Sequence, residues 1–481
     1  MKIKLHLQLV AVVALPLMTL AEDAVKPDVS DLMRFCQRDY LLGDWGGRRT
    51  ALKEKGVDFE VIYFSAVPSN LEGGAKRGSV YEGALLMMLD LDSEKLLGYH
   101  GGQLHVGGVN IHNTGLFSGS DTSANYVGDL NKVSLLDHPP TWQLWELWYE
   151  QKFLNDKVAL KFGQLAVDRD FILPEFYNSC ANITLLNQTF FYPKAALGGF
   201  DQPGFPTRNH GLATTPYSAP GVRLRIDPCQ YAYFQLGAYA GNPDRTHGGT
   251  DFTVNGDEGA LLYFELTLKI NQSKEASGPP GNLKVGGYYH TGDFVDRFEG
   301  AHNAFDTLTA GSGLPPLSPG PARDHGGNYG FYLLADQMLW RETDQNDPAH
   351  QGLAGFFRVA TAPSDRNLAE LGIDGGLVYN GLIPSRDWDT LALAYSYLKI
   401  SEDLRNAQRD INTHVVNDFS APAPFTKIAD YESVLEISYK MQLTAWMTVQ
   451  ASFQRVFHPG GRVLYDLPDA SVFIVQTSLR F

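Results

Sequence analysis

The stretch WQLWELWYEQKFLNDKVALKFGQLAV, residues Trp142–Val167, decides the fold class. Two runs, Trp142–Phe153 and Lys157–Val167, alternate between apolar and polar side chains. A period of two is that of a β-strand. The short connection between them, Leu154-Asn155-Asp156, is typical of a tight antiparallel hairpin. This stretch therefore predicts two neighbouring strands of an antiparallel sheet.

The same alternation recurs on both sides of this hairpin. Gly, Pro, Asn and Asp clusters separate the runs, so we predict many short strands and an all-β fold. The further predicted strands are Val57–Ala66, Tyr81–Leu91, Gly221–Ile226, Tyr231–Tyr239, Leu261–Ile270, Lys284–His290, Tyr329–Leu339, Leu353–Thr361, Gly375–Leu382, Thr390–Ile400, Glu432–Met441, Met447–Phe457 and Ser471–Phe481.

The connections between these strands fall into two size classes. Asp227–Gln230 is short, whereas Asn113–Thr141, Asp168–Pro220, Thr291–Asn328 and Ser401–Tyr431 are long loops rich in Gly, Pro, Ser and Asn. Short turns on one rim and long loops on the other are typical of transmembrane barrels. We predict a transmembrane antiparallel β-barrel of sixteen strands, with short periplasmic turns and long extracellular loops.

The first residues predict export from the cytoplasm. Lys2 and Lys4 precede the apolar run Leu9–Leu17, which small residues follow, as in a secretory signal peptide. We expect the signal peptide at residues 1–21, a periplasmic segment at 22–56 and the barrel at 57–481. Within the segment, residues 44–56 predict a short helix that begins at Asp44 and ends at Gly56. The alternative for the first residues is an N-terminal membrane anchor.

Composition excludes several function classes. The 481 residues carry a formal net charge of −15, which argues against a nucleic-acid partner. The cysteines Cys36, Cys180 and Cys229 allow one disulfide, Cys180–Cys229, or three unpaired thiols. The sequence has no zinc-ligand spacing and no GxSxG, HExxH, GxGxxG or Walker motif. We therefore predict no enzyme activity, no metal and no cofactor.

Several motifs in fixed order resemble one known family. They are Gly43–Thr50 (GDWGGRRT), Leu147–Gln151 (LWYEQ), Val158–Leu165 (VALKFGQL), Ala219–Arg225 (APGVRLR) and Glu432–Tyr439 (ESVLEISY). In this order they resemble the carbohydrate-selective porins of the OprB type, from about Leu42 to Phe481.

This resemblance implies a sixteen-stranded barrel in the outer membrane of a Gram-negative bacterium that passes glucose and other sugars by diffusion. Phe481 resembles the signal by which the barrel-assembly machinery recognises its clients. The expected partners are small neutral sugars and outer-membrane lipid, and the oligomeric state, monomer or homotrimer, stays open. The three cysteines and the extended Thr291–Asn328 loop depart from the family pattern and leave the sugar open.

Side-chain alternation selects candidates for the wall of the lumen. Charged groups of both signs exchange hydrogen bonds with sugar hydroxyls, and aromatic rings stack on pyranose faces. We expect Leu144 on the lumen side and Trp142 and Trp145 in the lipid-interface belt, because the Glu-bearing face is assigned to the lumen. The candidates for the lumen or its constriction are Arg223, Arg225, Glu146, Glu150, Trp148, Glu82, Glu436, Arg48 and Arg49.

Two questions remain open for these candidates. The first is whether Arg48 and Arg49 reach into the lumen or close its periplasmic mouth. The second is whether each charged residue contacts the sugar or only pairs with a residue of opposite charge. The predicted function is passive, carbohydrate-preferring diffusion through a polar constriction. The alternatives are a general or anionic-solute porin on the same barrel and a secreted carbohydrate-active enzyme.

Overall fold

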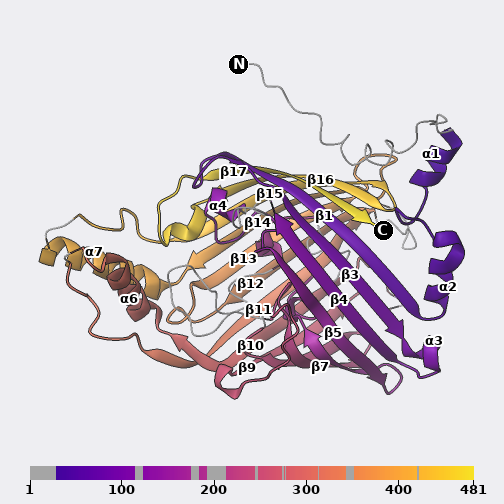
Figure 1. Ribbon diagram of the computed structural model, residues 1–481, viewed down its shortest axis with the longest axis horizontal. Helices are drawn as coiled ribbons and strands as arrows, with labels where there is room; N and C mark the ends of the chain where they lie inside the picture. Colours follow the sequence, from indigo (N-terminus) through magenta and orange to yellow (C-terminus); the bar gives the residue numbers. More distant parts are fainter. Residues whose placement is uncertain are drawn as a thin grey trace, which may run out of the picture.

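The protein forms one closed antiparallel barrel (Figure 1). The computed structural model describes residues 29–113, 123–174, 184–191, 213–243, 247–273, 276, 278–312, 314–342, 351–419 and 422–481. Sixteen strands pair with their neighbours in chain order, and β1 (Val57–Glu72) closes the ring by pairing with β17 (Ala470–Arg480). The short strand β2 (Gly78–Ser79) pairs with the end of β1 and lies outside the ring. The predicted sixteen-stranded barrel is confirmed.

The other elements follow in chain order. The remaining ring strands are β3 (Glu82–Asp92), β4 (Gly102–Asn113), β5 (Thr141–Phe153), β6 (Val158–Leu165), β7 (Ala219–Cys229), β8 (Ala232–Ala240), β9 (Ala260–Ile270), β10 (Gly281–Val295), β11 (Asp324–Arg341), β12 (Gly352–Thr361), β13 (Ala369–Asn380), β14 (Thr390–Ile400), β15 (Tyr431–Thr444) and β16 (Met447–Phe457). The α-helices are α1 (Val29–Cys36), α2 (Arg48–Glu54), α3 (Ser93–Leu97), α4 (Ala124–Val127), α6 (Arg297–Thr309) and α7 (Glu402–Phe419). The 3-10 turns are η1 (Trp45–Gly47), η2 (Val167–Arg169), η4 (Gln188–Phe190), η5 (Gly256–Glu258) and η6 (Pro459–Arg462).

None of the helices in the described residues is long and apolar enough to cross a membrane. The expected signal peptide and Cys180 lie outside the described residues.

The two rims of the barrel differ in the length of their connections. At one rim, the predicted hairpin turn joins β5 to β6 through Leu154, Asn155 and Asp156, with φ values of 54°, 55° and 64°. Asn and Asp tolerate this left-handed conformation better than most residues, so these residues suit the turn. We call this the short-turn rim, and the opposite one the long-loop rim.

The predicted helix at 44–56 lies at the short-turn rim and is shorter than expected. The carboxylate of Asp44 accepts the Thr50 N–H at 2.8 Å and so satisfies a free donor in the first turn of α2. Gly56 has a φ of +93° just beyond the helix, a conformation that favours glycine. β1 begins at the next residue, Val57.

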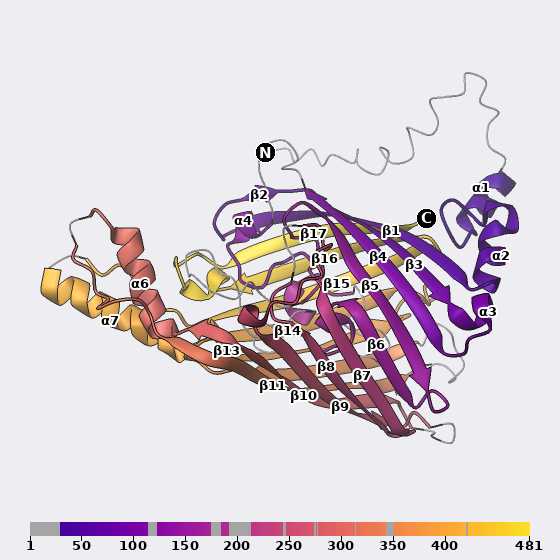
Figure 2. The same ribbon diagram turned by 60° about the horizontal axis from the view of Figure 1, so that its bottom comes forward.

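Two of the expected long loops contain α-helices of 13 and 18 residues. β10 extends to Val295, and α6 follows with the Asp296 carboxylate accepting the Glu299 N–H at 3.0 Å. α7 occupies much of the expected Ser401–Tyr431 loop and packs on α6. His302 of α6 and Asp410 of α7 are joined at 2.8 Å. This pair of helices stands at the end of the barrel opposite to α1, α2 and α3 (Figures 1 and 2).

The strand β4 was not among the predicted strands. It contains Gly107 and Gly108 at its centre, which have no side chain to mark a face. In its second half the apolar Val109 and Ile111 point inward, where they are buried, rather than toward the outer surface. The apolar-out pattern that identifies a barrel strand is therefore lost over half of its length.

A β-bulge in β5 corrects two of the expected side-chain directions. Gly107 pairs with Glu146 and Gly108 with Leu144, so Trp145 is an extra residue on β5. Trp145 consequently lies inside, only 3% exposed, and not in the lipid-interface belt. Leu144 takes the opposite phase from Glu146 and faces outward. Trp142 is 62% exposed, as a residue of the outer surface is expected to be.

The outer surface of the barrel is apolar. Val222 and Leu236 are exposed large apolar side chains on neighbouring strands, and Phe264 follows on the next strand. The same exposure is found on the far side of the ring, at Leu393 and Ile437. An apolar band around a closed barrel is the surface that lipid covers.

Candidate functional site

A row of opposite charges crosses the inner face of β5, β6 and β7. Register places Glu150 beside Lys161, and Lys161 beside Arg223. The Arg223 Nη2 donates to Glu150 Oε2 at 2.6 Å and to Asp170 Oδ1 at 3.3 Å. Lys161 Nζ donates to the same Asp170 oxygen at 2.8 Å. Asp170, from the connection after β6, therefore joins two cations of the wall, and we call these four residues the charge row.

The Trp148 ring lies beside the charge row. Lys161 Nζ is 4.5 Å from its ring centroid, which is a cation–π distance. His105 of β4 stacks on Trp148 with centroids 4.8 Å apart, and its Nδ1 lies 2.8 Å from Asp90. Side chains from β3, β4, β5 and β6 thus form one continuous polar and aromatic surface.

Arg169 adds a cation that the sequence did not reveal. Its guanidinium is 5.0 Å from the Trp145 ring centroid and 3.7 Å from Glu146. The Arg169 side chain is 48% exposed, whereas that of Glu146 is 4% exposed. Both Trp145 and Arg169 line a cavity of about 210 Å³ between the loops and the barrel wall. Arg169 lies on a connection without periodicity, and no pattern in the sequence marks it.

The connection after β6 holds two carboxylates with opposite pKa shifts. Burial raises the pKa of Asp168 to about 6, although its carboxylate accepts the Thr215 N–H at 2.9 Å. Burial also acts to raise the pKa of Asp170, but Lys161 and Arg223 hold that pKa below its usual value. Asp170 thus belongs to the charge row as an anion.

Glu82 and Glu436 are inward-facing as predicted, but the structure buries both completely. The Glu82 carboxylate accepts the Ser123 N–H at 2.9 Å. Glu436 accepts the N–H groups of Leu186 and Asn187 at 2.7 and 3.0 Å. With no exposed surface, these two carboxylates hold inward-folded loops against the wall and offer no contact to a passing solute.

Two further residues hold loops in the same way and were missed. Glu432 accepts the N–H groups of Leu130 and Asn131 at 2.7 and 2.6 Å. Arg358, 1% exposed, donates to the Thr189 carbonyl at 2.9 Å and pairs with Asp374. Inward-facing charges on several strands therefore fix the loops that narrow the lumen.

Arg49 does not reach the lumen. It is 5% exposed and donates to the carbonyls of Phe481 and Phe59 at 2.5 and 2.6 Å. Its guanidinium also lies 3.3 Å from the Tyr40 ring centroid. Arg49 thus ties α2 to the ends of β1 and β17, whereas Arg48 of the same helix is exposed.

Arg225 lies at the short-turn rim, as its position before the turn predicts. It donates to Asp227 at 2.7 Å and lies 3.8 Å from the Tyr233 ring centroid. Lys269 reaches the same carboxylate at 3.5 Å. Arg225, Asp227 and Lys269 line a cavity of about 710 Å³, which Glu150 also lines.

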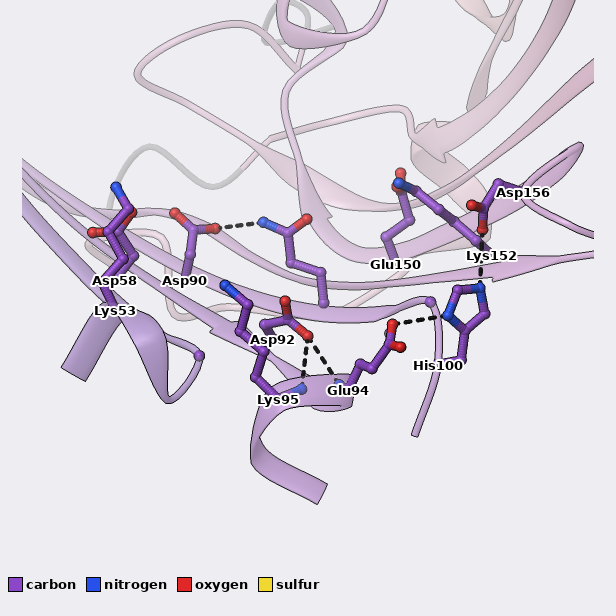
Figure 3. Close-up of a pocket in the computed structure, with 14 residues that line it drawn as sticks. Lys53, Asp58, Asp90, Asp92, Glu94, Lys95, His100, Glu150, Lys152 and Asp156 are labelled. Atoms are coloured by element: carbon purple, nitrogen blue, oxygen red, sulfur yellow. Dashed lines mark hydrogen bonds and ion pairs between the residues drawn. The ribbon is translucent and has the colours of Figure 1, made fainter. Parts of the chain in front are cut away.

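A second cavity adjoins it at the same rim. It has a volume of about 370 Å³ and shares Glu150, Lys152 and Asp156 with the first. Figure 3 shows His100 between Glu94 and Asp156, with distances of 2.8 and 3.5 Å. We call the two cavities together the exit cavities. Their basic lining residues are Lys53, Lys95, Lys152, Lys157, Arg223, Arg225 and Lys269, and their acidic ones are Asp58, Asp90, Asp92, Glu94, Glu150, Asp156 and Asp227, so the two signs balance.

A closed barrel with an apolar outside, inward-folded loops and a charged inner wall defines the class of outer-membrane porins. Within that class, residues 76–481 match the description "Carbohydrate-selective porin, OprB family", and the chain belongs to this family. It is a channel and not an enzyme. Family and fold place it in the outer membrane of a Gram-negative bacterium.

Three relatives show how widely the similarity extends. The chain is 26% identical to Porin B of Pseudomonas aeruginosa over 433 residues, covering 88% of this chain and 87% of that protein. It is 24% identical to the putative porin QuiX of Acinetobacter baylyi, covering 96% of each. The high-pH structure of Pseudomonas putida OprB superposes with a TM-score of 0.75 at 22% identity, over 93% of this chain and 99% of that one.

Proposed function

We propose that small neutral sugars of the glucose type diffuse passively through this lumen and leave by the exit cavities. The observation that carries the proposal is the balance of charge in these cavities. A wall with one dominant sign concentrates ions of the other sign. A wall of paired charges gives no such preference, yet it offers donors and acceptors to a solute rich in hydroxyl groups.

Contacts with the sugar are assigned to side chains that line cavities along the wall. Glu150 and Arg225 line the exit cavities, and Trp145 and Arg169 line the cavity nearer the loops. The side chains of Arg223 and Glu146, 7% and 4% exposed, hold these groups in position, and Trp148 is partly buried beside Lys161. Selectivity in such a pore requires contacts strong enough to replace hydration and weak enough to release the sugar.

Proteoliposome swelling tests this function. The detergent-purified protein is reconstituted, and the entry rates of monosaccharides, amino acids and salts of similar size are compared. The proposal expects monosaccharides to enter fastest. Equal entry of all small solutes would instead indicate a general diffusion porin, and faster entry of anions would indicate an anionic-solute porin.

Export and assembly complete the proposal. Residues 1–21 direct the chain across the inner membrane, and β17 with Phe481 is the segment that the assembly machinery recognises. The whole pathway lies within one barrel, so the proposed diffusion is the same for a monomer and for a homotrimer. Expression of the chain with and without residues 1–21 tests the export step. The amount of the protein in the isolated outer membrane is measured, and the chain without residues 1–21 should be missing from it.

A further inference from the structure

A group of apolar side chains is exposed at the short-turn rim. Figures 1 and 2 show α1, α2 and α3 following one another along this rim, beyond the ends of the strands. We call the following residues the rim patch, with their exposed fractions: Leu42 (59%), Trp45 (41%), Leu52 (41%), Leu96 (42%), Leu97 (82%) and Tyr99 (56%).

The α3 part of the rim patch points away from the lumen. In the single turn of α3, Glu94 and Lys95 line the smaller exit cavity. Successive helical residues are rotated by about 100°, so Leu96 and Leu97 project from the opposite side of this turn. The exposed leucines of α3 therefore lie on the outer side of the rim.

The rim patch continues the lipid-facing surface of the barrel. Arg49 fixes α2 on the carbonyls of Phe59 and Phe481. Phe59 itself is on the outward face of β1 and is 39% exposed. α2 is thus held at the level where the apolar band of the barrel ends, which is the depth of the lipid headgroups.

The chemistry of α2 fits that depth. Arg48 and Leu52 are four residues apart and share a face, and the exposed Lys55 follows three residues later. A helix face that combines apolar and basic side chains is typical of helices that lie in a membrane interface. Trp45 and Tyr99 have the amphipathic rings that concentrate at the headgroup level.

We propose that the rim patch docks on the periplasmic leaflet of the outer membrane, with Arg48 and Lys55 facing anionic phospholipid headgroups. The leaflet covers the apolar side chains that protein leaves exposed, and the two cations lie among the phosphates. This contact holds the N-terminal segment beside the barrel at the short-turn rim. It depends on membrane embedding alone and not on which solute passes.

Site-directed fluorescence in the full chain tests the proposal. In a C36S/C180S/C229S background, Leu97→Cys is labelled with an environment-sensitive nitrobenzoxadiazole dye. The protein is reconstituted in vesicles of phosphatidylethanolamine and phosphatidylglycerol. The proposal expects a lipid-borne bromine quencher to reduce this emission at least twofold, with little effect of iodide present on both sides. Glu94→Cys, on the lumen side of the same turn, is the matched control and should show the reverse.

Two results at position 97 would overturn the proposal. Quenching by iodide as strong as at position 94 would place the rim patch in periplasmic water. Protection from both quenchers would mean that protein, such as a second copy of the chain, covers it. Both variants replace exposed side chains, and the heat-modifiable mobility of the barrel confirms folding before the measurement.

A charge reversal tests the assigned headgroup. Arg48→Glu with Lys55→Glu should halve the lipid-borne quenching at position 97 in vesicles with phosphatidylglycerol. The same variant should leave quenching unchanged in phosphatidylcholine alone. Equal quenching of variant and parent in both lipids would overturn the assignment of anionic headgroups.

Discussion

The two sides of the lumen wall are built from the same kind of strand and have opposite chemistry. In the middle of β1, β3 and β4 the inward side chains are apolar, among them Phe64, Ala84 and Val109, all less than a tenth exposed. On β5 to β7 they form the charge row. The apolar side is one half of a hydrophobic core whose other half is the inward-folded loops. The difference teaches that the apolar middle of β1, β3 and β4 packs against inward-folded loops, whereas the charge row borders the exit cavities.

The largest expected effect comes from placing a charge on the apolar side. Val109→Asp would bury a carboxylate among apolar side chains, and we expect the free energy of unfolding to fall by about 3 kcal/mol. Thermal conversion of the folded barrel in detergent, followed by heat-modifiable mobility, measures this loss. Val109→Ile adds one methylene and keeps the site apolar, so it should cost only about 1 kcal/mol, the low end for an added methylene. Equal midpoints for the parent and Val109→Asp would show that this side is not a packed core.

A pH effect distinguishes the loop carboxylates. Because the pKa of Asp168 is raised to about 6 in the folded protein, its ionised form disfavours the folded loop. Stability of this loop should therefore rise as the pH falls from about 7 to about 4, by at most about 3 kcal/mol. The pKa of Asp170 is lowered in the folded protein, so its ionised form stabilises the loop. That contribution is lost only when the pH falls below the usual pKa of an aspartate.

Hydrogen exchange at the Thr215 amide measures this effect. After correction for the intrinsic pH dependence of exchange, protection should increase between pH 7 and pH 5. The matched variant Asp168→Asn keeps an oxygen acceptor for that amide and should lose the pH dependence. Unchanged protection in the parent over this range would contradict the shifted pKa.

On the charged side, Arg223→Ala breaks the charge row and leaves Glu150 and Asp170 without their shared donor. Loss of about 1 kcal/mol of polar interaction along the pathway lowers the preference for glucose over an uncharged non-sugar of similar size by roughly fivefold. Swelling rates of both solutes measure the ratio. Leu236→Ala, on the outer surface of β8, should leave this ratio unchanged, and an unchanged ratio in Arg223→Ala would refute the role of Arg223.

The smallest expected effect is at Arg169, which is half exposed and screened by salt. Arg169→Ala removes one cation beside the pathway, so the permeability ratio of cations to anions should rise by about two- to threefold at low salt. Reversal potentials across a planar bilayer with a salt gradient give this ratio. Arg409→Ala, on the exposed surface of α7, is the control and should not change it.

The sequence predicts which side chains of this wall face inward. It does not predict which of them bind loops and which line the solute pathway. Alternation placed Glu150, Arg223 and Glu436 inside, because a strand has a fixed period of two. It did not show that Glu436 binds the backbone of Leu186, since that contact joins residues 250 positions apart. Local patterns describe which face a side chain occupies, whereas the loop that meets it is set by tertiary packing.

The same reasoning explains the two errors on neighbouring strands. In β4 the apolar side chains face the loops rather than lipid, so the strand lacks the expected pattern. In β5 a single bulged residue reverses the phase of everything before it, and alternation read across the bulge assigned Trp145 to the wrong side. Both errors fall where the wall changes from the apolar to the charged side.

The seam between β1 and β17 has a consequence for how the barrel forms. Arg49 and Phe481, which meet there, are separated by 432 positions in the chain. Bringing together the ends of so long a segment reduces the conformational entropy of the chain. The free-energy cost is on the order of 5 kcal/mol. β1 can pair with β3 early, because that contact is local, but its other edge stays unpaired until the last strand arrives. Topology therefore makes ring closure the late and slow event of folding, and the contacts of Arg49 become available only once it is complete.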